Sequence, residues 1–393
     1  MKLLYIHQYF RTPEEGGAIR SWYISTAMVK AGYEVDLITA HNQDGYEVKD
    51  VEGVRVHYIP VKYENSFGFL KRFQSFISFA DKAYKYASRI SDIDLLYITS
   101  TPLTVGLIAL RLKRKKNLPY IFEVRDLWPE APIQIGLIKQ PWLKKITRRF
   151  ELRIYNKSEK IVALSPGTKD YIENLLPDKQ VHLCPNLSDC GFFKPDSEKD
   201  PDVASKFGIR NEFVISYFGA IGMVNHLEYL LNAASAIQNS ALSIIILIIG
   251  SGSRMHDLKK KAAKMELSNV YFLDHVNKYK LKEYLNITDA AYLSFGPYDI
   301  LEHNSPNKFF DSLASGKMVI TNVKGWIKDL VETNECGFFY DPENTDTLIS
   351  EIQAYLDDRE LLVKTQKKAR NLAEDKFDKE LRIPELLEFI VNG

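Results

Sequence analysis

The chain has 393 residues, a length that suits two domains, and its formal net charge of +1 says nothing about its partners. Apolar residues make up 45% of it, as in an ordinary globular protein, and three cysteines without zinc-type spacing indicate reduced thiols and a cytosolic setting. No signal peptide is recognisable at its start. The longest apolar run, 244–249, is far shorter than the roughly 20 residues of a membrane-spanning helix.

Short apolar segments alternate with helical patterns through the first half of the chain. Strands are expected at residues 3–7, 35–40, 54–59, 95–99, 120–124, 161–164 and 181–184. Between them, the spacing of apolar residues predicts a helix over 20–30 that stops at Gly32, and a long amphipathic helix over 66–89. Short apolar strands separated by helices indicate an α/β fold, with a parallel sheet covered on both faces.

Residues 185–203 interrupt this alternation, because they are rich in Pro, Asp and Ser and show no periodicity, which is typical of an interdomain linker. A second series of strands is expected at residues 214–218, 244–249, 270–273, 290–295 and 319–322, and the chain is helical from about 343 onward. We therefore predict two Rossmann-like domains that face each other across a cleft. The first is expected over 1–190, with a C-terminal helix at about 378–393 packing back onto it, and the second over 191–377.

Glycine-rich turns follow several of these predicted strands. Open parallel sheets bind ligands at the carboxyl ends of their strands, so Gly16-Gly17, the turn 219–222 and the turn 250–253 should border one cleft. Each glycine turn alone is more often a tight turn than a phosphate-binding loop. The GxGxxG pattern of nicotinamide dehydrogenases and the GxxxxGK[ST] pattern of P-loop NTPases do not occur, which argues against both classes.

One short stretch of the second half combines a helix start with charged residues. Ser305 is a natural N-cap, Pro306 suits the first helical position, and Gly316 suits the left-handed position after the helix end. Lys308 lies beside the free N–H groups of the helix start, where an anion is favoured. Asp311, one turn further, can accept two hydrogen bonds from a sugar diol. The stretch therefore predicts a nucleotide site, and a capped surface helix is the alternative.

The motifs, taken together and in order, resemble the retaining glycosyltransferases of family 4, which have the two-domain GT-B fold. The resemblance covers the following segments: GG at 16–17, EVRDLWPE at 123–130, YFGAIG at 217–222, IGSGS at 249–253, NVYFLDHV at 269–276 and SPNKFFDSLASGK at 305–317. The segments EVRDLWPE and SPNKFFDSLASGK look most like bacterial enzymes that build O-antigen and capsule polysaccharides. The resemblance implies transfer of a sugar from a nucleotide diphosphate donor, expected to be UDP-linked, to a glycan or polyprenyl-linked acceptor.

The resemblance also implies roles for residues of the second domain. The family has two acidic residues eight positions apart; the second maps to Asp311, which should bind the ribose hydroxyls, whereas the first falls on His303. Either Glu302, one residue away, supplies the missing catalytic carboxylate, or the turn that contains Ser305 and Asn307 replaces that contact.

Diphosphate binding departs from the family pattern, because Ala220 and Asn225 stand where many members carry an arginine and a lysine. A diphosphate leaving group needs positive charge in the transition state. We expect Lys308 to supply it, with Arg254 as the second candidate; otherwise helix dipoles and backbone N–H groups must carry the charge alone. The other nucleotide contacts that the resemblance implies come from Gly16, Gly17, Gly219, Gly222, His275 and Val276.

The segment EVRDLWPE corresponds to the acceptor side of the family's cleft. Asp126 lies just past an apolar strand and is expected to orient the acceptor hydroxyl or to act as its base, with an N-cap as the alternative. Glu123 and Arg125 are expected to form the wall of the site. Trp128 either stacks on a sugar or is buried, and His7 either faces the cleft or is structural.

No metal or other cofactor is expected. The single Asp-x-Asp, at 92–94, precedes a strand and is typical of a turn, and helix ends with Lys308 would replace the cation. Nucleic acid is not an expected partner, because no recognition motif accompanies the basic residues. Two alternatives remain open: a UDP-sugar 2-epimerase on the same fold, and an inactive membrane-associated partner subunit. Ala220, Asn225 and His303 motivate the second alternative.

Positive charge is concentrated in one part of the chain, since residues 62–160 contain 20 Lys and Arg against 9 Asp and Glu. The helix over 66–89 combines an aromatic stripe with flanking cations, and the runs 113–116 and 144–153 add more. This pattern suits an interfacial helix on anionic lipid, and a core helix with solvated lysines is the alternative. The resemblance favours peripheral contact with the inner face of the membrane, because the family's acceptors are often lipid-linked.

Overall fold

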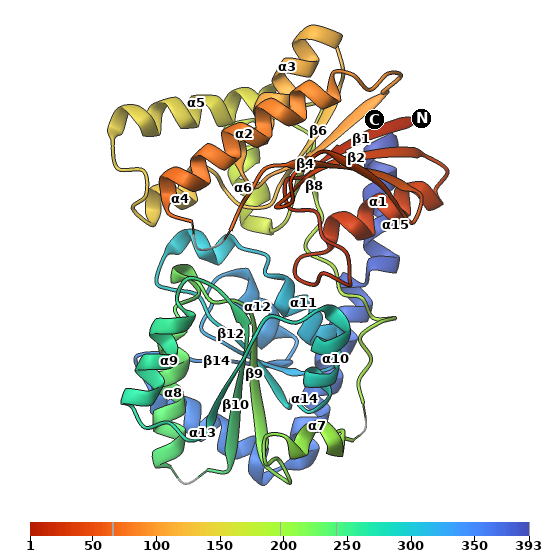
Figure 1. Cartoon of the computed structure of the whole chain (residues 1–393). Helices are drawn as coiled ribbons and strands as arrows, with labels where there is room; N and C mark the ends of the chain where they lie inside the picture. The colour runs from red at the N-terminus through yellow and green to blue at the C-terminus, as the bar shows by residue number, and fades with distance from the viewer. Residues whose placement is uncertain (65–66, 197, 241, 393) are drawn as a thin grey trace.

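The structure is a computed structural model that describes residues 1–64, 67–196, 198–240 and 242–392. Ser66 at the start of the predicted amphipathic helix, Ser197 in the predicted linker and Gly393 in the predicted last helix lie outside these ranges. Within them the chain forms two Rossmann-like α/β domains, one above the other in Figure 1, each built on its own sheet. The predicted fold class is confirmed.

The sheet of the first domain has the order β3-β4-β2-β1-β5-β6-β7-β8. Its strands are β1 (Lys2–Ile6), β2 (Glu34–His41), β3 (Glu47–Val51), β4 (Val54–Pro60), β5 (Leu95–Thr99), β6 (Tyr120–Val124), β7 (Lys160–Ala163) and β8 (Val181–Leu183). All neighbours are parallel except β3 and β4, which form an antiparallel hairpin at the sheet edge. The hairpin turn, Glu52-Gly53, has positive φ at both residues, as a two-residue hairpin turn requires.

Helices cover both faces of this sheet. They are α1 (Arg20–Lys30), α2 (Phe69–Ala87), η1 (Leu103–Val105), α3 (Gly106–Lys116), α4 (Glu130–Gln134), α5 (Pro141–Lys157) and α6 (Pro166–Leu175). Apolar residues of α2, α3, α5 and α6 form one core with the sheet, and those of α1 form the core on the opposite face. In α2 the predicted stripe divides: Phe76 and Ala80 are buried, whereas Leu70, Phe73 and Ile77 are exposed.

The sheet of the second domain has the order β11-β10-β9-β12-β13-β14 and is parallel throughout. Its strands are β9 (Phe213–Ala220), β10 (Ile244–Ser251), β11 (Val270–Leu273), β12 (Ala290–Leu293), β13 (Met318–Thr321) and β14 (Gly337–Phe339). Its helices are α7 (Pro201–Ser205), η2 (Met223–Asn225), α8 (Glu228–Asn239), α9 (Met255–Lys264), α10 (Lys278–Asn286), η3 (Asp299–His303), α11 (Asn307–Ala314), α12 (Trp326–Thr333), α13 (Thr345–Asp357), α14 (Arg359–Leu372) and the π-helical turn η4 (Ala373–Phe377). Separate apolar cores fill the two faces of this sheet as well.

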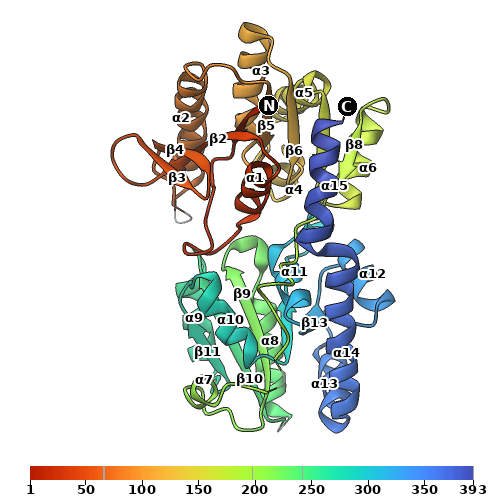
Figure 2. The same cartoon turned by 90° about the vertical axis from the view of Figure 1, so that its right-hand side faces the viewer.

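The chain passes between the domains twice, and the two crossings lie side by side (Figure 2). The backbone N–H of Ser188 donates to Phe377 O at 2.8 Å, and that of Lys379 donates to Ser188 O at 2.8 Å. After the second crossing, helix α15 (Lys379–Val391) packs on the first domain, where Ile383 and Leu386 join the core that contains Ile24. Burying each such side chain stabilises the packing by about 1.5–3 kcal/mol.

Candidate active site

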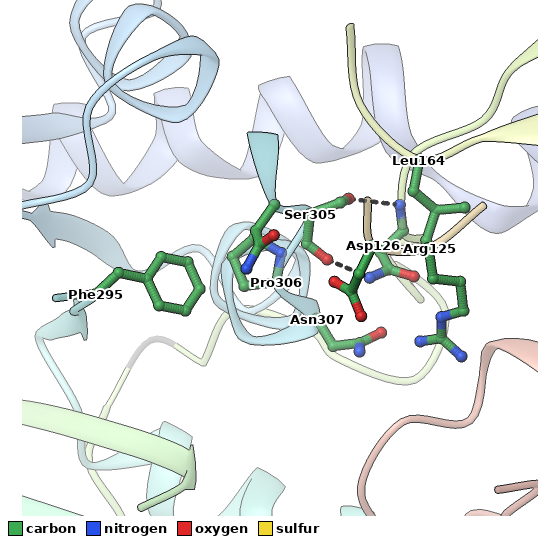
Figure 3. A pocket seen from close by; sticks show the side chains of 9 residues that line it. Arg125, Asp126, Leu164, Phe295, Ser305, Pro306 and Asn307 are labelled. Atoms are coloured by element: carbon green, nitrogen blue, oxygen red, sulfur yellow. Dashed lines mark hydrogen bonds between the residues drawn. The ribbon is translucent and has the colours of Figure 1, made fainter. Parts of the chain in front are cut away.

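A cavity of about 210 Å³ lies between the domains, at the carboxyl ends of strands from both sheets. Its lining residues are Arg125, Asp126, Leu164, Asn186, Phe295, Asn304, Ser305, Pro306 and Asn307. Figure 3 shows Arg125, Asp126 and Leu164 of the first domain facing the start of α11 and Phe295 of the second. Two predicted site segments, EVRDLWPE and SPNK, therefore meet in space although they are far apart in sequence.

The start of α11 differs from the prediction in its cap. The helix begins at Asn307, and Pro306 occupies the cap position, with φ −75° and ψ 126° and no capping side chain. Ser305 does not cap the helix, because its Oγ accepts a hydrogen bond from the backbone N–H of Asn186 at 3.1 Å and its carbonyl accepts from the Asn186 amide. The helix end follows the prediction: Gly316 has φ 61°, and its N–H donates to Leu313 O at 2.9 Å.

Lys308 projects from the first turn of α11 toward the glycine turn after β9. Its Nζ lies 3.7 Å from the centre of the Tyr217 ring, and a Cβ added at Gly219 would approach that Nζ to 3.3 Å. The amino group is buried, although the residue as a whole is partly exposed, and it makes no hydrogen bond with any residue in the described ranges. Burial lowers the pKa of Lys308 to about 7. A buried, unpaired amine beside a glycine turn is well placed to meet an anion.

The strands β9 and β10 extend further than predicted, so Gly219 and Gly250 pair with each other inside the sheet. A Cβ at Gly250 would lie 1.9 Å from Gly219 O, so only glycine allows these strand ends to approach so closely. Gly222 donates its N–H to Oδ1 of Asn225 at 3.3 Å. Asn225, which stands where the family pattern has a lysine, therefore stabilises the turn itself, and Ala220 adds no charge to it.

Arg254, the second predicted counter-charge, is not free to take that role. Its guanidinium pairs with Glu228 at 2.9 Å and with Asp257 at 3.0 Å. The pair with Glu228 could not be foreseen, because that residue is 26 positions away in the sequence. Among the predicted cations, Lys308 is therefore the one that the structure leaves available at the glycine turns.

The carboxylate of Asp311, predicted to bind a ribose, is already hydrogen-bonded to another side chain in the structure. Its carboxylate accepts a charged hydrogen bond from Lys278 Nζ at 2.6 Å, and both side chains are buried. Burial raises the pKa of Asp311, and the charge of Lys278 opposes that rise. A ribose that binds Asp311 must therefore share this carboxylate with Lys278, a residue that the sequence did not single out.

Glu302 and His303, the candidates for the first acidic position, both lie in η3 and outside the lining of the cavity. Glu302 packs near Gly325, where an added Cβ would come within 3.5 Å of Oε2. The His303 ring packs on the start of α6, since a Cβ at Gly167 would lie 2.0 Å from its Nδ1. Neither residue lines the cavity with Asp126, and a catalytic role for Glu302 stays a prediction.

The first-domain residues divide between the cavity and the core. Asp126 lines the cavity and accepts a hydrogen bond from Thr101 Oγ1 at 2.8 Å, and Arg125 lies beside it. Glu123 does not form the wall, contrary to the prediction: it is fully buried, pairs with Arg20 at 3.0 Å and accepts from Tyr97 Oη at 2.7 Å. The charge of Arg20 holds the pKa of Glu123 below its usual value, against the effect of burial.

Neither of the two aromatic candidates of the first domain lines the cavity. Trp128 packs edge-on against Phe76 of α2, with 6.4 Å between ring centres, and does not line the cavity. His7 is buried, and its Nδ1 lies 2.6 Å from Ser21 Oγ. Burial holds the pKa of His7 well below its usual value, with Arg125 adding to the effect, so the ring is neutral at pH 7.

The loop that carries Gly16 contacts the predicted nucleobase segment directly. A Cβ at Gly16 would lie 2.7 Å from Val276 O, and His275 Nε2 lies 3.3 Å from Glu15 O. The backbone N–H of Lys278 also donates to Pro13 O at 3.3 Å. The structure thus brings Gly16, His275 and Val276 together at the interface between the domains.

The predicted site residues did not include the lining residues Leu164, Asn186, Phe295 and Asn304. Leu164 follows β7 and Phe295 lies just beyond β12, so the rule that ligands bind at strand ends could have found both. Asn186 carried no local signal, because its partner Ser305 is 119 residues away. Its Oδ1 is buried and has no hydrogen-bond partner among the residues that the structure describes.

The fold and the placement of these residues define the class of the protein: a GT-B glycosyltransferase. Residues 15–186 match the family profile described as a glycosyl transferase 4-like domain, and residues 200–372 match that of the glycosyl transferases group 1. One model covers most of the first domain and the other most of the second, and the prediction that the chain is a glycosyltransferase is confirmed.

Solved structures show the same fold. A sucrose-phosphate synthase from Thermosynechococcus elongatus has a TM-score of 0.79 at 16% identity, over 100% of this chain and 98% of that one. The Anabaena protein HepE, in complex with UDP and glucose, has a TM-score of 0.70 at 15% identity, over 100% of both chains. WaaG, a glycosyltransferase involved in lipopolysaccharide biosynthesis, has a TM-score of 0.68 at 15% identity, also over 100% of both. A search of curated proteins found no match.

The described residues show neither a metal-binding cluster nor a membrane-spanning helix. No group of three or more His, Cys, Asp or Glu in these ranges is placed to hold a metal ion. No helix in the same ranges is long and apolar enough to cross a membrane. Independence from a metal cofactor stays a prediction.

Proposed function

We propose that this glycosyltransferase moves a sugar from a UDP-sugar to a glycan or polyprenyl-linked acceptor, in the synthesis of a bacterial surface polysaccharide. Retention of anomeric configuration and the polysaccharide context rest on the resemblance of EVRDLWPE and SPNKFFDSLASGK. UDP is favoured because HepE, which shares the fold, was solved with UDP and glucose. The observation that carries the proposal is the unpaired amino group of Lys308 beside Gly219.

The proposed chemistry uses residues on both sides of the cavity. The bond between the anomeric carbon and the β-phosphate oxygen breaks, and UDP leaves with the electron pair. Lys308 and the N–H groups at the start of α11 stabilise the charge that develops on the diphosphate. The acceptor oxygen forms the new bond to the anomeric carbon, and its proton passes to Asp126. Because Asp126 and Asn307 line the same cavity, acceptor and donor would meet there.

Membrane contact is part of the proposal. On the first domain, Leu70 and Phe73 of α2 and Trp142 and Ile146 of α5 are each at least half exposed. Cations accompany them, and apolar side chains among cations suit the surface of an anionic membrane. We therefore expect a cytoplasmic protein that binds the inner membrane face with its first domain.

The test begins with a panel of nucleotide-sugars and thermal melting, because ligands that bind only the folded state raise its melting temperature. The stabilising donor is then incubated with and without a membrane-lipid acceptor fraction, and UDP release and sugar transfer are measured. We expect transfer to depend on the acceptor and to fall at least about 100-fold in Asp126→Asn. Epimerised donor without UDP release would establish the epimerase instead, and absence of UDP binding would establish the inactive subunit.

A further inference from the structure

A groove of about 700 Å³ lies on the first domain between α4, α5 and α6. The long helix α5 forms one wall with Lys144, Lys145, Arg149 and Leu152, and α6 contributes Tyr171 and Leu175. These α5 positions recur at helical spacing, so a single face of the helix carries both the cations and the leucine. The proposed transfer chemistry uses none of these residues.

The cations of this groove are available for an anion. Lys144, Lys145 and Arg149 have no ion pair with any carboxylate in the described ranges, whereas Arg148 pairs with Glu130 at 2.6 Å. The remainder of the lining is mostly apolar, since Leu152 and Leu175 are both about two-fifths exposed. An apolar channel with unpaired cations at its rim complements an anionic amphiphile, and it suits neither a free sugar nor an acidic peptide without apolar side chains.

Glu151 forms part of the groove floor and supports the same kind of ligand. It is 1% exposed, its Oε2 accepts a hydrogen bond from Tyr171 Oη at 3.1 Å, and its Oε1 has no partner among the described residues. Burial raises the pKa of Glu151 to about 8, so this carboxyl is protonated at neutral pH. At this position the floor therefore does not repel an anion, and the other acidic lining residue, Glu130, is paired with Arg148.

Two segments connect this groove to the interdomain cavity. Asp126 lines the cavity and Glu130 the groove, and Leu164 lines the cavity and Tyr171 the groove. At a helical rise of 1.5 Å per residue, the segment from Leu164 to Tyr171 spans on the order of 10 Å. The segment from Asp126 to Glu130 spans at most about 14 Å, the length of four fully extended residues. A ligand held in the groove could therefore present its polar end at Asp126.

We propose that this groove binds the lipid carrier of the acceptor, as a single-chain phosphate amphiphile. Its hydrocarbon chain would lie along Leu152 and Leu175, and its phosphate would contact Lys144, Lys145 and Arg149. The sugar attached to that phosphate would then extend past α4 toward Asp126. The inference rests on the proposed function for the identity of the carrier, whereas the binding itself is measurable without any turnover.

Calorimetry with decyl phosphate tests the site directly, with decanol and inorganic phosphate as probes that carry one half of the ligand each. We expect decyl phosphate to bind at least about tenfold more tightly than either half, because the groove pairs an apolar wall with cations. Lys144→Ala/Lys145→Ala and, separately, Leu152→Asn should each weaken its binding about tenfold or more. Lys260→Ala/Lys264→Ala removes two exposed lysines of α9 and should leave the binding unchanged.

Thermal stabilisation by UDP in each variant shows that the fold and the donor site are intact. The inference is overturned if inorganic phosphate binds as well as decyl phosphate, or if the Lys144/Lys145 variant keeps full affinity. It is also overturned if the protein binds vesicles of phosphatidylglycerol and phosphatidylcholine but not decyl phosphate, which would make this face a bilayer contact only. If decyl phosphate binds and UDP does not, binding of a phosphate amphiphile in the groove is supported and the proposed transferase function is refuted.

Discussion

Lys278 and Asp311 form a buried ion pair, with 2.6 Å between Nζ and Oδ2, where α10 and α11 meet near the first domain. The backbone N–H of the same lysine donates to Pro13 O in the loop that carries Gly16. Lys278 thus contacts both Asp311, the residue predicted to bind the ribose, and the opposite domain. A nucleotide that binds Asp311 must share the carboxylate with Lys278, so its binding site lies next to this interdomain contact.

This ion pair should be costly to break from one side. Asp311→Ala leaves a buried ammonium without its partner, and we expect a loss of about 3–5 kcal/mol in the free energy of unfolding. The double variant Lys278→Met/Asp311→Leu replaces both charges and should lose far less. Urea unfolding of the three proteins measures this, with Asp329→Ala, at an exposed position of α12, as the control. Equal losses in the single and double variants would show that the loss of stability comes from packing and not from the unpaired charge.

Lys308 should take up a proton when UDP binds. Its pKa is lowered to about 7 by burial, below the usual value near 10.5, so the free protein holds this amine largely neutral at pH 8. A phosphate beside it favours the charged form and raises the pKa, which draws a proton from the buffer. Calorimetry of UDP binding at pH 8 in Tris and in HEPES should therefore give different heats. Lys308→Met should abolish the difference and lower turnover about 100-fold; identical heats in the wild type would place the diphosphate elsewhere.

Glu151 should make the protein less stable as the pH rises. Its pKa is about 8 in the folded protein and near 4.5 when exposed, so the folded state binds more protons between these values. The free energy of unfolding should therefore fall from pH 5 to pH 8, and Glu151→Gln should flatten that slope. The exposed Glu360→Gln is the matched control. Parallel curves for Glu151→Gln and the wild type would contradict a protonated Glu151.

Gly167 should be sensitive to a single added methyl group. A Cβ there would lie 2.0 Å from Nδ1 of His303, so Gly167→Ala must displace that ring, and we expect η3, which carries it, to move as well. Alanine is otherwise the better helix residue by roughly 0.5–1 kcal/mol, so stability should hardly suffer. Turnover should fall about tenfold or more, because small misplacements of site residues are costly. Gly167→Ala/His303→Ala should recover it; a double variant as slow as the single would refute the steric explanation.

Regular elements were predictable because their signals are local. Helix α1 matches the predicted residues 20–30, since its apolar spacing and its stop at Gly32 lie within one stretch of chain. The strand β3 was missed because Lys49 and Asp50 are exposed and its sequence shows no apolar alternation. Strand β3 forms because it pairs with β4 in a hairpin, and the composition of β3 itself does not indicate that pairing.

The candidate site divides in the same way. Lys308 and Asp126 could be located from a helix start and a strand end, which are local features. Asp311 pairs with Lys278 and Glu123 with Arg20, which lie 33 and 103 positions away in the sequence. Because these partners are not local, the sequence predicted a ribose contact for Asp311 and a place in the site wall for Glu123. Charged side chains are satisfied by whatever lies nearest in space, and one sequence does not reveal those neighbours.

The return of the chain to the first domain through α15 has a consequence for biosynthesis. Ile383, Leu386 and Ile390 fill one face of a sheet whose first strand begins at Lys2, yet they are translated after the whole second domain. While the ribosome still holds these residues, the apolar face around Ile24 stays uncovered. The nascent first domain therefore exposes a patch open to chaperones or aggregation until synthesis reaches α15.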